Sequence, residues 1–123
     1  MNVVAINKSK NRETPDENDK GGFIEFLFTE PVHRVNSITM VGITKPRRGF
    51  VAGVRGNGRR LPRRFIPVRR NGRPSVVRPH GFVNVKKLRT VLFSSGGIAK
   101  LELTVCRKRK FDYRPNHTWY PSA

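Results

Sequence analysis

The sequence predicts an all-β protein: an antiparallel β-sandwich of jelly-roll-like form with extended N- and C-terminal tails. Apolar and polar residues alternate with a period of two in several segments, as they do in half-buried strands. These segments recur at intervals of roughly 8 to 14 residues, separated by Gly, Pro or Asn-Gly, which is typical of sandwiches and barrels. No window shows the apolar stripe of a helix.

Three segments are predicted along the chain of 123 residues: a polar N-terminal arm at 1–21, a β-sandwich domain at 22–106, and a basic and aromatic C-terminal tail at 107–123. The 36% hydrophobic fraction suits one modest core. The apolar start is too short for a signal peptide, and no stretch approaches the roughly 18 apolar residues of a membrane span. We therefore expect no signal peptide, no membrane partner, and a place in a virion or an intracellular assembly.

Strands are predicted from the first alternating segment onward. In GGFIEFLFTEP, Ile24 and Phe26 share one face, and Pro31 ends the strand. In VNSITMVGI, which is rich in β-branched residues, the alternation places Ser37 on the face opposite Ile38. Further strands are predicted at Phe50 to Arg55, Arg64 to Val68, Ser75 to Arg78, Leu88 to Phe93 and Ile98 to Cys106.

The arginine-rich middle of the chain is predicted to belong to the folded domain. Asn71-Gly72 lies between RFIPVRR and RPSVV, and Asn-Gly favours a type I′ hairpin turn. Prolines recur from Pro62 to Pro79, and proline cannot donate to a strand ladder, so this segment is expected at a sheet edge or across an open end. Phe50 and Phe65 are predicted to lie in the core.

The charge balance predicts an anionic partner. The chain has 26 Lys and Arg against 8 Asp and Glu, a net charge of +18, and no carboxylate lies between Pro31 and Leu101. Such a domain repels itself, so bound phosphates, sulfates or carboxylates should stabilise it. The alternative is a solvated basic face without a partner.

Two sets of residues are predicted to make the contacts. Arginine favours bidentate contacts with phosphate or carboxylate groups. The polyanion-binding set is Arg47, Arg48, Arg55, Arg59, Arg60, Arg63, Arg64, Arg69, Arg70, Arg73, Arg78, Arg107, Lys108, Arg109 and Lys110. The aromatic residues of the tail would complete the core of their own domain or anchor a partner, and the anchoring set is Phe111, Tyr113, Trp119 and Tyr120.

Nucleic acid is a possible polyanion, and the aromatic residues decide how it would be bound. Base stacking needs aromatic side chains interleaved with the cations. Because Phe50 and Phe65 are the aromatic residues of the middle segment and are predicted to be core, contacts with backbone phosphates, without sequence preference, are expected instead.

The sequence argues against an enzyme. General acid and base catalysis needs paired carboxylates or a His with a carboxylate, and the candidates such as Glu25 and Glu30 are few. The three histidines lack metal-ligand spacing, and the single Cys106 can form neither an internal disulfide nor a cysteine cluster. We predict no catalytic residue, no metal, no cofactor and no small-molecule substrate.

The order of motifs resembles a known family of modules. GGFIEFLFTEPVHRVNSITMVGI is followed by a glycine-bearing middle and by VNVKKLRTVLFSSGGIAKLELTVC, over roughly residues 21–106. This pattern resembles small jelly-roll-like β-sandwich modules of algal and bacterial surface and secreted proteins. The resemblance implies a jelly-roll-like fold, with carbohydrate or calcium binding as the roles of such modules. Those modules tend to be acidic and to follow a signal peptide, whereas this chain is rich in arginine.

The first hypothesis for function is a non-enzymatic structural protein that cements a large assembly, such as a minor capsid protein of a virion, through its arginine-rich surface and contacts with protein neighbours. The second is a nucleic-acid-binding protein without sequence preference, ribosome-associated or genome-packaging. The third is a lectin-like module for anionic glycans, which rests on the fold resemblance.

Overall fold

The computed structural model describes residues 3–9, 22–42, 49–67, 73–92, 96–105, 109–114 and 117–119, the first and last of these ranges by their backbone. These residues form nine strands in one antiparallel sheet and no helix. The strands are β1 (Val3–Ser9), β2 (Gly22–Val41), β3 (Phe50–Arg55), β4 (Arg64–Phe65), β5 (Ser75–Val77), β6 (Val83–Leu92), β7 (Gly96–Thr104), β8 (Lys110–Tyr113) and β9 (His117–Trp119). The predicted all-β, antiparallel class is confirmed.

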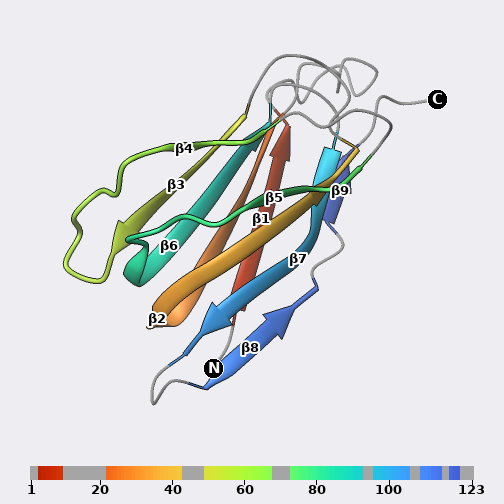
Figure 1. The fold of residues 1–123 in the computed structure, drawn as a ribbon. Coiled ribbons are helices and arrows are strands. Elements are labelled where there is room, and N and C mark those ends of the chain that lie inside the picture. The colour runs from red at the N-terminus through yellow and green to blue at the C-terminus, as the bar shows by residue number, and fades with distance from the viewer. Residues whose placement is uncertain are drawn as a thin grey trace.

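The long strand β2 organises the sheet, whose main order is β4-β3-β6-β2-β7-β8. β2 pairs with β1 as far as Phe28 and with β6 as far as Arg34, and from Arg34 onward it pairs with β7 and then also with β5. Figure 1 shows β2 bending sharply at its middle, so that its two halves lie in different layers. The jelly-roll-like sandwich stays a prediction, because the strands belong to one connected sheet that bends on itself.

The sequence predicted that the strand ends at Pro31, but β2 continues through this proline. The bend of β2 explains why. The ladder between β2 and β6 is interrupted between Leu27 and Val32, and Pro31 lies inside this interruption. A proline there removes no ladder hydrogen bond with β6, because none is formed at that position. β2 therefore continues through Pro31 and joins two segments that were predicted as separate strands.

A single core lies between the layers. The prediction that Ile24 and Phe26 share one face is confirmed, and both side chains are fully buried. In the second half both Ser37 and Ile38 are buried, although strict alternation puts them on opposite faces. A register shift between Val35 and Ser37 causes this, because one extra residue in a strand exchanges the faces that follow it. The prediction of one continuous alternation in this segment was wrong.

The sheet extends into both segments that were predicted as tails. β1 lies within 1–21 and pairs with β2, while β8 and β9 lie within 107–123 and pair with β7. Tyr113 of β8 packs edge-to-face on the buried Phe26, with ring centroids 6.0 Å apart. Tyr113 therefore helps to complete its own core, the first of its two predicted roles.

The arginine-rich middle lies at an edge of the sheet. β4 ends the strand order, as the prolines predicted. Asn71-Gly72 lies outside the described residues, and the strands on either side of it do not form the predicted hairpin, because β4 pairs with β3 and β5 pairs with β2. In the described part of the chain, no helix has the length and apolar character to cross a membrane.

Candidate polyanion-binding face

The candidate site lies on the outer face of β3 and β6. In β3, Val51 and Gly53 are buried, so Phe50, Ala52 and Val54 project outward. In β6, Leu88 and Thr90 are buried, so the alternate positions Lys87, Arg89 and Val91 project outward. The ladder between β3 and β6 pairs these positions as Phe50 with Val91, Ala52 with Arg89, and Val54 with Lys87.

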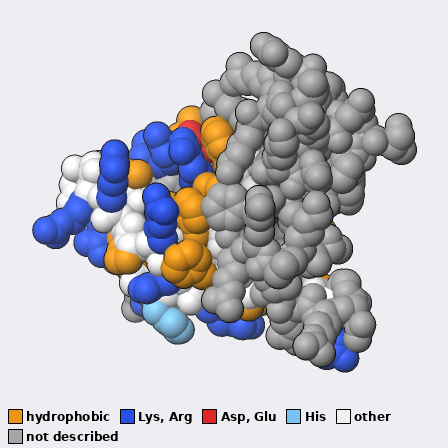
Figure 2. All heavy atoms as spheres, turned by 90° about the horizontal axis from the view of Figure 1, so that it is seen from above, with side chains coloured by type: hydrophobic (Ala, Val, Ile, Leu, Met, Phe, Trp, Pro, Cys, Tyr) orange, Lys and Arg blue, Asp and Glu red, His pale blue; other side chains and the backbone are white. Residues whose placement is uncertain are grey.

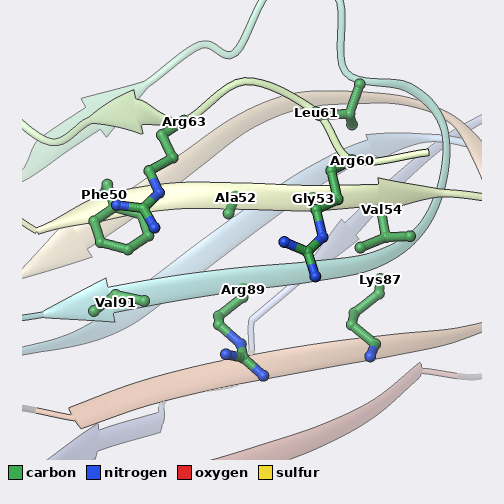
Figure 3. A pocket seen from close by; sticks show the side chains of 10 residues that line it. All are labelled: Phe50, Ala52, Gly53, Val54, Arg60, Leu61, Arg63, Lys87, Arg89 and Val91. Carbon is green, nitrogen blue, oxygen red and sulfur yellow. The ribbon is translucent and has the colours of Figure 1, made fainter. Parts of the chain in front are cut away.

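These side chains surround a hollow of about 370 Å³, which we call the cationic hollow (Figure 3). Its lining residues are Phe50, Ala52, Gly53, Val54, Arg60, Leu61, Arg63, Lys87, Arg89 and Val91. Three guanidinium groups and one ammonium group therefore lie around a single concave surface. Figure 2 shows Lys and Arg side chains gathered on one side of the described surface, with apolar side chains between them.

The segment after β3 turns back along that strand and brings two of the arginines to the hollow. Arg60 forms a bridge with Val54, and the amide of Leu61 donates to the carbonyl of Gly53 at 2.9 Å. Leu61 is buried against Gly53, where a Cβ would come within 3.0 Å of the leucine side chain. The buried leucine anchors the segment, so that Arg60 and Arg63 are held at the outer face.

Two guanidinium groups of this face lie on phenyl rings. The guanidinium carbon of Arg63 is 4.3 Å from the ring centroid of Phe50, and that of Arg89 is 4.4 Å from the ring centroid of Phe23 on β2. Contacts of this kind hold a cation in place by its attraction to the face of the ring. They fix the direction of both arginine side chains before any ligand binds.

Glu25 supplies the carboxylate of this face and is already bound. Its side chain is buried, and Arg89 donates from Nε at 2.8 Å and from Nη2 at 2.6 Å to the same oxygen, Oε2. Among the described residues no ion pair involves Arg60, Arg63 or Lys87. These three cations therefore have no internal counter-charge there.

The structure separates the predicted polyanion-binding set into groups. Arg60 and Arg63 line the hollow. Arg64 donates instead to the carbonyl of His80 at 3.0 Å, and Arg55 is half-buried at the end of β3. The exposed members elsewhere are Arg59, Arg73, Arg78, Arg109 and Lys110. The members outside the described residues are Arg47, Arg48, Arg69, Arg70, Arg107 and Lys108, as is the predicted anchor Tyr120.

The anchoring set is likewise divided. Phe111 is 36% exposed on β8, and its predicted role as a partner anchor stays a prediction. Trp119 is placed by the backbone pairing of β9 with β7, opposite Gly96. With Tyr113 packed on the core, Phe111 is the member whose described side chain presents an apolar surface to solvent.

Two cations of the cationic hollow and the exposure of Phe65 were not predicted from the sequence. Lys87 and Arg89 were not in the predicted set, although the alternation along VNVKKLRTVL puts them on one face of a strand. Phe65 was predicted to be core and is 64% exposed. Because β4 is a two-residue edge strand, the neighbouring Ile66 is the residue that enters the core, and Phe65 projects outward.

The outer face of β7 and β8 has a different charge pattern. Lys100 lies 3.1 Å from Glu102 and 3.9 Å from Asp112, so positive and negative groups are paired there. The hydrogen bonds from Lys100 and from Ser37 lower the pKa of Glu102 below its usual value. We call this surface the charge-balanced face.

The described residues contain no group of His, Cys, Asp and Glu that could hold a metal ion. Comparison of the chain with protein-family models, with curated proteins and with solved structures finds no match. The geometry of the cationic hollow is therefore the basis for assigning a function.

Proposed function

We propose that this chain is a non-enzymatic interaction protein that holds an anionic polymer in its cationic hollow. One observation carries the proposal: Arg60, Arg63 and Lys87 lie around one concave surface with no carboxylate paired to them among the described residues. Guanidinium groups bind phosphate and carboxylate groups with two parallel hydrogen bonds. An anionic polymer can meet several such cations at once.

The net charge of the chain supports a lasting partner. A charge of +18 on 123 residues repels itself in the isolated protein, and a polyanion that binds only the folded chain stabilises it by mass action. We propose that the setting is a large assembly, with a virion and the role of minor capsid protein as the first candidate. The exposed Phe111 on β8 would then meet a protein neighbour.

Binding to inorganic polyphosphate tests the proposal, because this polymer carries phosphate charge and no other recognition group. The combined substitutions Arg60→Gln, Arg63→Gln and Lys87→Gln remove three charges from the hollow. Log affinity falls as log salt concentration rises, and we expect the substitutions to make this slope less steep by about 2. The reason is that fewer phosphate contacts are made on binding, so fewer counterions are released. Titrations between about 0.05 and 0.2 M salt measure this slope.

A matched control changes the net charge by the same amount elsewhere. Arg109, Lys110 and Arg114 are exposed on and beside β8, and their substitution by Gln removes three charges from that side. The proposal expects the control to keep most of the salt dependence of the parent protein. Equal losses in the two variants would show that only net charge matters, and polyphosphate binding that ignores salt would reject the proposal.

A further inference from the structure

We infer that the anionic polymer is a single-stranded nucleic acid, whose bases stack on Phe65 and on the Arg63–Phe50 pair while Arg60 and Lys87 bind its phosphates. This inference rests on the proposed function and adds the class of polymer. Its basis is a row of three phenylalanines and one valine, which we call the aromatic row; it passes through the cationic hollow at Phe50 and Val91, and the sequence did not predict it.

The row follows from the strand register. Phe65 of β4 lies directly opposite Phe50 of β3, Phe50 lies opposite Val91 of β6, and Val91 lies opposite Phe23 of β2. Residues directly opposite each other in an antiparallel sheet project from the same face. The four apolar side chains therefore form one row, with Arg63 on one ring and Arg89 on another.

Phe65 has the exposure that a stacking platform needs. It is 64% exposed, the largest value among the exposed large hydrophobic side chains of the described residues. Bases of a single strand stack on exposed aromatic rings and on the planes of arginine guanidinium groups. Next to Phe65, the guanidinium of Arg63 covers Phe50 and offers such a plane.

The cations lie at regular intervals from this row along the strands. Successive outward positions along a strand are about 7 Å apart. Arg89 is one position from the row, and Lys87 is two positions from it on the same strand. Arg60, opposite Val54, is also two positions along. Phosphates could therefore contact the cations while the adjoining bases reach the aromatic row.

The edge of the sheet argues against another protein strand as the occupant. The exposed Pro62 and Pro67 flank β4, and proline has no amide hydrogen to donate to an incoming strand. A duplex also fits the row poorly, because its bases are stacked inside and cannot reach Phe65. The aromatic row with its flanking cations thus favours single-stranded nucleic acid.

Three oligonucleotides test the inference: a single strand of about 12 thymidines, an abasic strand with the same number of phosphates, and the duplex of the first with its complement. We expect the parent protein to bind the thymidine strand tightest. Phe65→Ala should weaken that binding about 5- to 100-fold and leave the affinity for the abasic strand unchanged, since only base stacking is lost. Phe65→Trp should keep or raise the affinity for the thymidine strand.

Phe111→Ala is the matched control, because it also removes an exposed phenylalanine but from β8. It should leave all three affinities unchanged, and equal melting temperatures of the parent and Phe65→Ala would show that the fold is kept. Equal binding of the thymidine and abasic strands, or an equal effect of Phe65→Ala on both, overturns the inference and leaves the proposed function standing. If polyphosphate also fails to bind, the proposed function falls with it.

Discussion

The cationic hollow and the charge-balanced face are built from the same sheet, yet they treat charge in opposite ways. On β7 and β8, Lys100 lies between Glu102 and Asp112, so these three charged side chains pair with one another. On β3 and β6, Arg89 uses the carboxylate of Glu25, and the other cations of the hollow have no ion pair among the described residues. Among the described residues, the same sheet pairs its charges on one face and leaves cations without ion pairs on the other, and this contrast is the basis of the proposed binding surface.

The largest expected effect comes from breaking the sheet beneath the cationic hollow. A Cβ at Gly49 would collide with the carbonyl oxygen of Val91, at the place where β3 approaches β6. Gly49→Ala should lower the free energy of unfolding by about 3 kcal/mol, because backbone has to move to make room. Denaturant unfolding measures the change.

Gly58→Ala is the control for that substitution. Gly58 has a φ of +88° but no atom within 4 Å of a Cβ, so alanine there meets only the strain of a left-handed backbone. Its cost should be about 1 kcal/mol. A cost at Gly49 no larger than the cost at Gly58 would show that β3 and β6 are not packed as closely as the structure has them.

The next effect sharpens the contrast by removing the carboxylate that pairs with Arg89. Glu25→Gln breaks the ion pair with Arg89, and because the glutamate is buried this should cost about 1 to 2 kcal/mol of stability. The same change adds one unpaired cation, so affinity for polyphosphate at low salt should rise a few-fold. The melting temperature should thus fall while the affinity for polyphosphate, measured by titration, rises. A fall in both quantities would refute this role of Glu25.

The smallest effect is expected on the charge-balanced face. Since the hydrogen bond from Lys100 lowers the pKa of Glu102 in the folded protein, the charged carboxylate stabilises the fold above its ordinary pKa. This contribution to stability disappears as the pH falls through the lowered pKa of Glu102. Glu102→Gln should cost less than about 1 kcal/mol at pH 7, because solvent reaches both partners of the pair and screens their attraction.

The pH dependence provides the check on Glu102. The stability difference between the parent protein and Glu102→Gln should shrink in acid, where the parent carboxylate is itself protonated. Melting temperatures from pH 7 down to about pH 3 would show this convergence. A difference that stays constant over this range would mean that the substitution acts through packing instead of charge.

Much of the fold could be predicted because strand alternation is a local property. The burial of Ile24 and Phe26 follows directly from their period of two. The sharp bend of β2 through Pro31 could not be predicted in this way, because it depends on where the ladder with β6 is interrupted. The face exchange after Val35 has a similar origin, since a bulge leaves no mark in the apolar pattern.

Only part of the candidate site could be predicted, because the rest of it also depends on how distant segments pair. The density of arginine identified Arg60 and Arg63, but a count of charges cannot say that Arg64 turns to the carbonyl of His80. Arg89 lies in a different segment and joins the hollow only through the pairing of β3 with β6. The exposure of Phe65 depends on its place in a two-residue edge strand, which tertiary structure decides.

Chemical acetylation of lysines, read by mass spectrometry with and without polyphosphate, tests the central claim most directly. Lys87 lines the cationic hollow and Lys100 lies on the charge-balanced face, and both are half-buried. The account predicts that polyphosphate protects Lys87 and leaves the reactivity of Lys100 unchanged. Equal protection of the two lysines, or protection of Lys100 alone, would contradict the assignment of the cationic hollow as the binding surface.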